Sequence, residues 1–308
     1  TWEGAWIDFL RLADVDGNGT EDLVLSAVDL SYSGERGMLW VMRRVRGRVF
    51  EGFQDYDYRP TAPVPQGPAR FVNVATVDFE RKGRSDLLVS DPGRLVLMRS
   101  ESDGVLEPPV DLGPGGLAAA QDLDGDGRTD VVLAVGDTLV VRLCREDGTL
   151  GPADTVAGRR LDCIADFNGD TKPDLLVEPT GGAKYILVND GSGGFLPPVS
   201  VQVEDFPVDP FDFGTLAAGD FDGDGRADLA VSWFIPGDYV IPGADSVAIF
   251  HNDDGGRFSR FRTYLASSLE WSASWYERSV WAGDLNRDGH ADLAVLTVGQ
   301  GRDVADEA

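Results

Sequence analysis

Aspartate and asparagine recur at fixed spacing along this chain, in a pattern that suits metal binding. The copy that begins at Asp220 reads Asp-Phe-Asp-Gly-Asp-Gly-Arg-Ala-Asp, so carboxylates stand at positions 1, 3, 5 and 9. Glycine at position 6 permits a sharp turn, and the backbone carbonyl at position 7 offers a further oxygen. A short loop of this kind wraps Ca²⁺ with oxygen ligands, whereas zinc and copper favour softer donors. The spacing therefore predicts calcium.

The acidic loop occurs six times, which lowers the chance that it is merely a solvated turn. Every copy has aspartate at position 9 and an apolar residue at position 12, whereas an EF-hand needs glutamate at position 12. Position 2 is apolar in every copy, which predicts a side chain that holds the loop against the core. The first aspartates of the six copies are Asp14, Asp78, Asp122, Asp166, Asp220 and Asp284.

Five copies are predicted to bind calcium, and one is not. The copy at Asp78 has Glu80 at position 3 and Lys82 at position 5, so we expect the ammonium to replace the ion and to pair with Asp78 and Asp86. The copy at Asp166 has Thr171 in place of glycine and is the weakest of the five. The predicted ligands, with position 7 acting through its carbonyl, are Asp14, Asp16, Asn18, Thr20 and Asp22; Asp122, Asp124, Asp126, Arg128 and Asp130; Asp166, Asn168, Asp170, Lys172 and Asp174; Asp220, Asp222, Asp224, Arg226 and Asp228; and Asp284, Asn286, Asp288, His290 and Asp292.

The spacing of the loops predicts an all-β fold. Successive first aspartates are 64, 44, 44, 54 and 64 residues apart, so the repeat is a unit of 44 residues with insertions. One of the 44-residue spacings ends at Asp166, and the unit around that loop contains four β-rich runs, at 161–167, 174–177, 185–188 and 199–203. Four short strands per repeat of this length are typical of the blade of a β-propeller. A β-sandwich would not repeat an acidic loop at this period.

We therefore expect a single β-propeller domain over residues 1–308, with blades that start near residues 5, 70, 115, 160, 213 and 279. Five blades are complete in the sequence. Residues 283–298 supply only two strands of the sixth, so the expectation is a piece of a longer protein or an incomplete ring.

The loops resemble FG-GAP, or VCBS-type, repeats, which form the blades of integrin α-chain propellers and of many bacterial surface proteins. The resemblance covers essentially the whole chain, although the Phe-Gly signature is clear only at Phe213-Gly214. It implies that each calcium loop joins the innermost strand of a blade to the second strand. The inner strands would then include residues 6–13, 71–77 and 216–219.

Composition excludes several classes of protein. Acidic residues outnumber basic residues by 53 to 27, and the formal charge of −26 would repel nucleic acid and anionic lipid. No apolar run approaches the length of about 20 residues that a membrane helix needs. Cys144 and Cys163 allow at most one disulfide, and two unpaired thiols are the favoured interpretation.

No catalytic constellation is evident. His251 and His290 are the only histidines, and neither lies in a Ser-His-Asp, HExxH or phosphate-binding pattern. We expect His251 to lie in a turn at the end of a strand, and the ring of His290 to lie on the surface. The chain is therefore not predicted to be an enzyme.

Insertions between the repeats place aromatic residues at the end of the blades opposite the calcium loops. The inserted segments are 29–37, 55–68, 233–245 and 267–279. They suit glycan stacking or protein contact, unless the rings only pack their own loops. The candidate ligand-binding residues are Trp233, Tyr239, Trp271, Trp275 and Tyr276.

These features together predict a secreted or cell-surface, calcium-stabilised recognition or adhesion module. The expected partner is a glycan or an extracellular protein. Two alternatives remain: a lectin proper, and an accessory or catalytic propeller of a polysaccharide-degrading enzyme.

Overall fold

The computed structural model describes residues 5–29, 36–46, 49–58, 73–91, 94–179, 183–204, 215–235, 244–268 and 277–298, and every regular element in these ranges is a β-strand. The chain divides into two compact units, residues 1–160 with 191–193 and residues 161–190 with 194–308. The described part contains no helix long and apolar enough to cross a membrane. The single domain over residues 1–308 stays a prediction.

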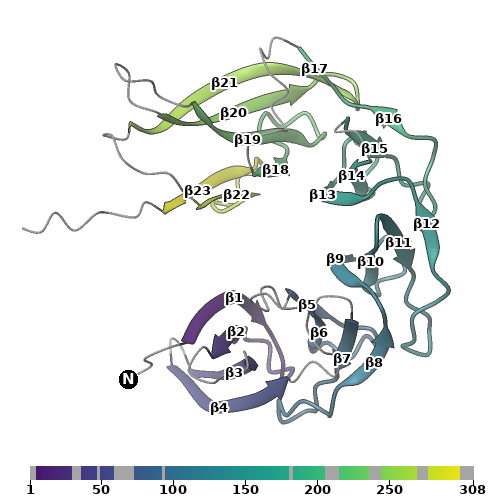
Figure 1. Ribbon diagram of the computed structural model, residues 1–308, viewed down its shortest axis with the longest axis vertical. Coiled ribbons are helices and arrows are strands. Elements are labelled where there is room, and N and C mark those ends of the chain that lie inside the picture. Colours follow the sequence, from purple (N-terminus) through teal and green to yellow (C-terminus); the bar gives the residue numbers. More distant parts are fainter. Residues whose placement is uncertain are drawn as a thin grey trace, which may run out of the picture. The chain divides into compact units, whose positions relative to one another are not determined.

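The first unit contains three four-stranded antiparallel sheets, each built from four strands in chain order (Figure 1). The first sheet holds β1 (Ala5–Ala13), β2 (Asp22–Asp29), β3 (Arg36–Arg46) and β4 (Val49–Tyr58). The second holds β5 (Asn73–Val77), β6 (Asp86–Asp91), β7 (Arg94–Met98) and β8 (Val110–Gly113). The third holds β9 (Gly116–Gln121), β10 (Asp130–Val135), β11 (Thr138–Arg142) and β12 (Asp154–Val156).

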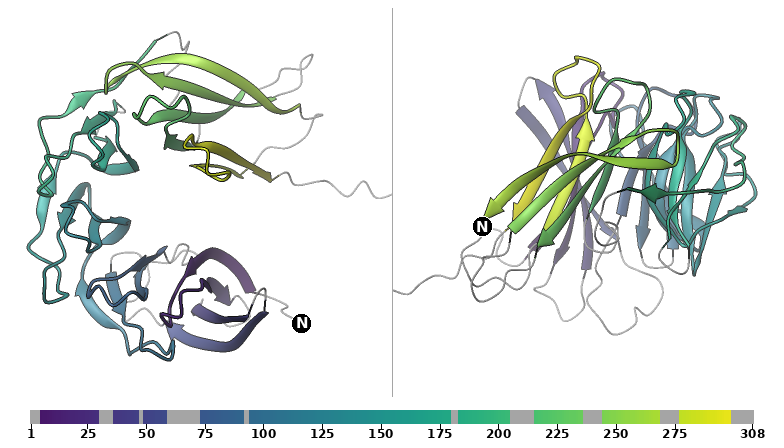
Figure 2. Two further views of the ribbon diagram at one scale, coloured as in Figure 1. Left: turned by 180° about the vertical axis from the view of Figure 1, so that it is seen from behind. Right: turned by 90° about the horizontal axis from the view of Figure 1, so that it is seen from above.

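The second unit contains sheets of four, five and two strands. The four-stranded sheet holds β13 (Arg160–Ala165), β14 (Asp174–Glu178), β15 (Tyr185–Leu187) and β16 (Val199–Ser200). The five-stranded sheet runs in the order β17 (Gln202–Val203), β21 (Arg257–Ser268), β20 (Ala244–Asn252), β19 (Asp228–Ile235) and β18 (Leu216–Gly219). Figure 2 shows the long, twisted β20 and β21 of this sheet. The last sheet pairs β22 (Glu277–Gly283) with β23 (Asp292–Val298).

Every predicted acidic loop connects a strand at one edge of a sheet to the strand hydrogen-bonded beside it. Residues 14–21, for example, join β1 to β2, and residues 220–227 join β18 to β19. The four strands expected in the unit around Asp166 are all present, which confirms the repeat as a four-stranded blade. The run at 199–203 is divided, however, because Gln202 and Val203 pair in parallel with Arg257 and Phe258 of the following sheet.

The hydrophobic core lies between neighbouring sheets, and the residue at loop position 2 is part of it. Val15, Phe79 and Phe167 are at most 1% exposed, and each packs into the cluster shared by its own sheet and the next. Leu285 is the exception, since it is 75% exposed and no later sheet packs over it in the described residues. The prediction of a buried side chain at position 2 is therefore wrong for the last loop.

Two of the predicted insertions are shorter than expected, because the strands continue into them. Trp233 lies in β19, where it is paired with Ser246 of β20. Tyr56 and Tyr58 likewise lie in β4 and pair with residues of β3. The placement of Trp233 in an inserted turn is thus wrong. Tyr239, Trp271, Trp275, Tyr276 and Phe213-Gly214 lie outside the described residues.

Both cysteines are free, as the composition favoured. Cys144 is buried, and burial raises the pKa of its thiol to about 11, so the unreactive thiol form prevails at neutral pH. Burial also raises the pKa of Cys163.

Candidate metal centre

The aspartate at position 9 ties each loop to its sheet. In five loops one carboxylate oxygen accepts the backbone N–H of position 2, at 2.8–3.1 Å. In five loops the other oxygen accepts a backbone N–H from the end of the third strand, at 2.7–2.8 Å. We call this pair of bonds the aspartate clamp. Its aspartates are at most 2% exposed in five of the six loops: Asp22, Asp86, Asp130, Asp174 and Asp228.

A second set of bonds shapes the loop itself. The position-1 carboxylate accepts the N–H of position 6 in all six copies, at 2.6–2.9 Å. In the five loops predicted to bind calcium, position 3 accepts the N–H of position 5, and position 5 accepts the N–H of position 7. These successive Asx turns bring the side-chain oxygens of one loop together.

The backbone turns through the left-handed region twice in every copy, at positions 4 and 6. Position 4 has φ values from 55° to 82°, and position 6 has values from 69° to 90°. Only glycine adopts this region without steric cost, and yet three copies use other residues. Arg81, Thr171 and Arg287 are the non-glycine residues with positive φ in the described chain, and all three stand at these positions.

Three pairs of neighbouring loops are joined by a further backbone bond. The position-8 N–H of one loop donates to the position-1 carbonyl of the loop before it, from Ser85 to Asp14 at 2.6 Å and from Ala291 to Asp220 at 2.7 Å. Ala227 donates to Asp166 in the same way. The exposed ring of His290, at position 7 of the loop at Asp284, lies against Gly223 of the preceding loop. A side chain at position 223 would collide with this ring.

Three loops bring carboxylate oxygens within 4.8 Å of one another. These are the predicted ligands at positions 1, 3 and 9 of the loops at Asp14 and Asp122, and at positions 1, 3 and 5 of the loop at Asp220. The donor set is one of hard oxygens, which is the set that Ca²⁺ prefers. The fit of these side chains to a calcium ion is therefore good, with Arg128 and Arg226 forming ion pairs to the position-5 aspartates at the rim.

In the loop at Asp78 the ammonium of Lys82 forms an ion pair within the loop, as predicted, but with a different carboxylate. The ammonium of Lys82 pairs with Glu80, and the guanidinium of Arg99 lies 3.7 Å from the same carboxylate. The expected pairs of Lys82 with Asp78 and Asp86 are therefore replaced by a pair with Glu80. Glutamate at position 3 is longer than aspartate, so its carboxylate meets the ammonium first.

The loop at Asp284 lacks part of the clamp. Asp292 accepts the N–H of Leu285 at 2.9 Å and that of Asn286 at 3.3 Å, and both bonds use the same oxygen. The last sheet has two strands in the described chain, so no third-strand N–H reaches the other oxygen there. Asp292 is also more exposed than the other clamp aspartates.

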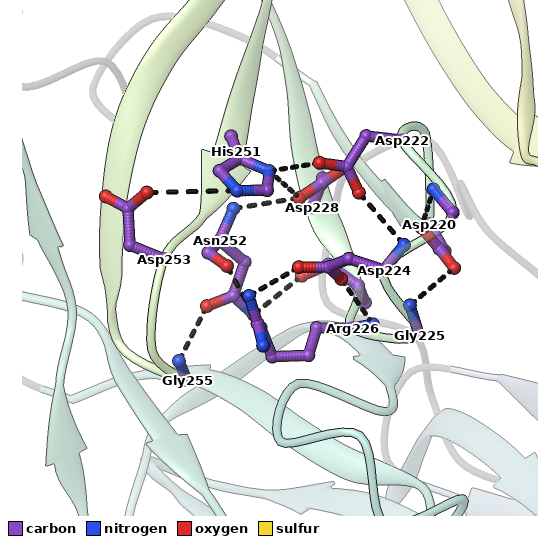
Figure 3. Close-up of polar contacts among 12 residues, drawn as sticks. Asp220, Asp222, Asp224, Gly225, Arg226, Asp228, His251, Asn252, Asp253 and Gly255 are labelled. Carbon is purple, nitrogen blue, oxygen red and sulfur yellow. Dashed lines mark hydrogen bonds and ion pairs between the residues drawn. The ribbon is translucent and has the colours of Figure 1, made fainter.

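Sequence reasoning missed one residue of the loop at Asp220. His251 does not lie in a turn; it is the penultimate residue of β20, paired with Ser259 of β21. Its Nδ1 lies 2.7 Å from an oxygen of Asp222 and 3.4 Å from one of Asp228 (Figure 3). His251 and Arg43 each stand directly before the residue whose backbone N–H completes the clamp, Asn252 and Arg44. The sequence contains both residues, but only the clamp bonds reveal that the two positions correspond.

Burial carries an electrostatic cost for the ionised clamp aspartates. It is the largest cause that raises the pKa of the clamp aspartates, and the carboxylates at positions 1 and 3 add to it in the loops at Asp14 and Asp122. The clamp bonds act in the opposite direction. Burial prevails at Asp130, whose pKa is raised to about 6. A bound cation would relieve this penalty.

Known proteins share this architecture. A profile of FG-GAP-like repeats matches residues 78–133, 122–177, 166–231 and 237–295, which include five of the six acidic loops. No curated protein matches the chain.

Among solved structures, the chain is similar to an Agrocybe aegerita lectin that recognises non-reducing terminal N-acetylglucosamine, with a TM-score of 0.61 and 21% identity over 96% of this chain and 77% of that one. The V. cholerae biofilm matrix protein Bap1 gives a TM-score of 0.41 and 14% identity over 95% and 52%. The C-terminal WD40 domain of Sif2 gives 0.39 and 12% over 88% and 67%. With the repeated four-stranded sheets, the likeness to the lectin establishes a β-propeller fold.

The left-handed backbone at position 6 yields a stability prediction. Thr171→Gly should stabilise the protein by about 0.5–1 kcal/mol, because glycine removes the steric cost of φ 69° at a β-branched residue. This gain exceeds the free-energy cost of ordering glycine, which has the larger conformational entropy in the unfolded state. Gly225→Ala is the matched control, since a Cβ there meets nothing within 4 Å and only the backbone is tested. It should destabilise by about 1 kcal/mol. Urea unfolding measures both, and a destabilised Thr171→Gly protein would contradict the assignment.

The raised pKa of Asp130 yields a prediction about pH. In chelator, the folded protein binds a proton at Asp130 between the unfolded pKa of about 3.9 and the folded pKa of about 6. The stability that this group contributes is therefore complete below about pH 4 and lost as the pH rises through about 6, by about 3 kcal/mol. Asp130→Asn should flatten the curve of unfolding free energy against pH over this interval. Parallel curves for the two proteins would show that Asp130 titrates normally.

Proposed function

The chain belongs to the FG-GAP-like repeat family, and from this premise we propose that it is a calcium-stabilised, extracellular recognition module whose ligand is a glycan. The observation that carries the proposal is the repeated acidic loop, in which three carboxylates lie within 4.8 Å of one another in the loops at Asp14, Asp122 and Asp220. We propose Ca²⁺ at five loops, those at Asp14, Asp122, Asp166, Asp220 and Asp284, with the loop at Asp78 free of metal.

Calcium would act on the fold rather than on a substrate. Five dications would reduce the formal charge from −26 to −16 and neutralise carboxylates that the loops hold within 4.8 Å of one another. Binding to the folded state alone would stabilise it by mass action. Loops of this kind in extracellular modules bind calcium at about 10⁻⁴ to 10⁻³ M, a concentration that is met outside cells, and this supports a secreted or surface location.

A glycan ligand is supported by the lectin to which the chain is similar and by the aromatic residues of the insertions. Trp271, Trp275 and Tyr276 fall within ten residues of sequence, at the link between the fifth and sixth repeats. Aromatic rings bury large apolar area at little entropic cost, and long loops on a rigid scaffold are where recognition concentrates. An extracellular protein ligand is the alternative outcome of the same binding screen.

We propose no catalytic activity. The acidic side chains of the loops are engaged by the clamps and turns, and no nucleophile with an adjacent base accompanies them in the described residues. An accessory or catalytic role on polysaccharides would be revealed by release of reducing sugar or of unsaturated product.

Calcium removal is predicted to destabilise the protein. Chelation by EDTA should lower the melting temperature, and calcium should restore it, because the crowded carboxylates repel one another without the ion. Differential scanning calorimetry measures the shift. An unchanged melting curve in EDTA would refute a structural role for calcium.

Two single substitutions test how many calcium ions the protein binds. Lys82→Asp restores a carboxylate at position 5 of the loop at Asp78 and should add one calcium equivalent in a calorimetric titration. Asp122→Asn weakens one of the acidic loops and should reduce the calcium bound by one equivalent at a concentration that saturates the other sites.

The inserted tryptophans are predicted to anchor the glycan. Trp271→Ala and Trp275→Ala should each reduce affinity by about 1–3 kcal/mol for a glycan identified on an array that includes terminal N-acetylglucosamine, with little change in melting temperature. Trp281→Ala is the matched control, because Trp281 is 52% exposed on β22 and belongs to no insertion. Full affinity in the Trp271 and Trp275 double variant would mean that these rings only pack their own loop.

A further inference from the structure

The residue that precedes the third-strand donor of the aspartate clamp occupies the same register in five sheets. Its side chain can reach the inside of the acidic loop, as Arg99 shows by lying 3.7 Å from Glu80 at position 3. In four sheets this residue cannot coordinate a metal ion. The five residues are Arg43, Arg99, Leu143, Val188 and His251.

His251 brings a nitrogen donor to the loop at Asp220 (Figure 3). Its Nδ1 lies 2.7 Å from Oδ2 of Asp222 and 3.4 Å from Oδ1 of Asp228, and the three donor atoms lie within 4.8 Å of one another. Two ligands bound to one ion at about 2.1 Å are about 2.7–3.5 Å apart at angles of about 80–110°. The spacing of Nδ1 from both carboxylates is therefore that of ligands around a common ion.

The imidazole nitrogen is buried and lacks a hydrogen bond. Nδ1 of His251 has almost no accessible surface, and neither carboxylate meets the geometry of a hydrogen bond with it despite the short distances. A protonated ring held only as a counter-ion would direct its N–H at one acceptor, because a buried donor is normally paired. In the unprotonated ring, Nδ1 would offer its lone pair to an ion held by the two carboxylates, as a metal ligand does.

The surroundings hold the ring in place. Asn252, the next residue, is fully buried, and its side chain donates to the carbonyls of Phe167 at 2.8 Å and Ala227 at 2.9 Å. The other ring nitrogen of His251 faces Asp253, with 3.8 Å between Nε2 and Oδ1. This separation is longer than a hydrogen bond, so Asp253 acts on the ring through its charge.

We propose that Asp222, Asp228 and His251 form a site for a divalent transition metal of the zinc class, which the other loops lack. Imidazole is a good ligand for Zn²⁺ and Co²⁺ and is not among the oxygen ligands that Ca²⁺ takes. The two carboxylates are shared with the calcium loop, so the two ions compete there. The site does not depend on calcium binding at any other loop.

Cobalt provides the direct test, because Co²⁺ reports its ligands through visible absorption. The full chain is freed of metal, titrated with Co²⁺ and then with Zn²⁺, and compared with His251→Ala and His251→Gln. We expect one equivalent whose absorption is displaced by Zn²⁺, and a loss of affinity of at least tenfold in both variants. His290 remains in both variants, so the loss belongs to His251. Thermal melting in EDTA confirms that each variant is folded.

A transplanted ligand provides the converse test. The loop at Asp14 carries Asp16 and Asp22 at the positions of Asp222 and Asp228, and Arg43 stands in the register of His251. Arg43→His should therefore add a second cobalt equivalent.

Equal cobalt affinity and absorption in wild type and both His251 variants would overturn the proposal. Calcium is titrated in parallel to separate this result from the proposed function. Loss of cobalt binding in the His251 variants of a chain that binds no calcium would uphold the transition-metal site and refute the calcium proposal. Normal calcium binding, together with cobalt binding that the His251 substitutions leave unaltered, would uphold the calcium proposal and refute the transition-metal site.

Discussion

The structure depends on a buried carboxylate that joins three parts of the blade in the loops at Asp14, Asp122, Asp166 and Asp220. The aspartate at position 9 begins the second strand, accepts an N–H from its own loop and accepts another from the end of the third strand. A carboxylate with both oxygens so engaged fixes the loop relative to the sheet more firmly than a turn alone. Hydrogen bonds to a charged acceptor are the stronger ones, and a buried aspartate without them would be costly.

The clamp also explains why the loops suit metal ions. It holds one carboxylate at the base of the loop, while the Asx turns and two left-handed residues direct the remaining oxygens to the same centre. The energetic cost of this arrangement is chiefly the burial of the clamp aspartates, and repulsion from the carboxylates at positions 1 and 3 adds to it; both raise the pKa of Asp22 and Asp130. Cationic side chains of this chain reduce that cost in several loops. Lys82 and Arg99 approach Glu80, Arg128 pairs with Asp126, and Arg226 pairs with Asp224.

Neighbouring sheets complete one another within each unit. The apolar residue at position 2 packs against the following sheet, and the N–H at position 8 bonds back to the preceding loop. A loop is therefore fully formed only when its own third strand and a following sheet are both present. Asp292 and Leu285 illustrate this, since the first lacks a third-strand donor and the second is 75% exposed within the described chain.

Local spacing was sufficient to predict the repeat, the four-stranded blades and the positions of the acidic loops. These features depend on residues within about ten positions of one another, where side-chain type and turn chemistry decide the outcome. Tertiary structure alone decided that the side chain of His251 meets the loop at Asp220, that Trp233 and Tyr56 lie in strands, and that Gln202 joins the following sheet. Each of these depends on the register between segments that are distant in sequence, or on the reach of one side chain into a neighbouring loop. A one-dimensional pattern carries neither quantity, because strand register is set by the packing of whole sheets.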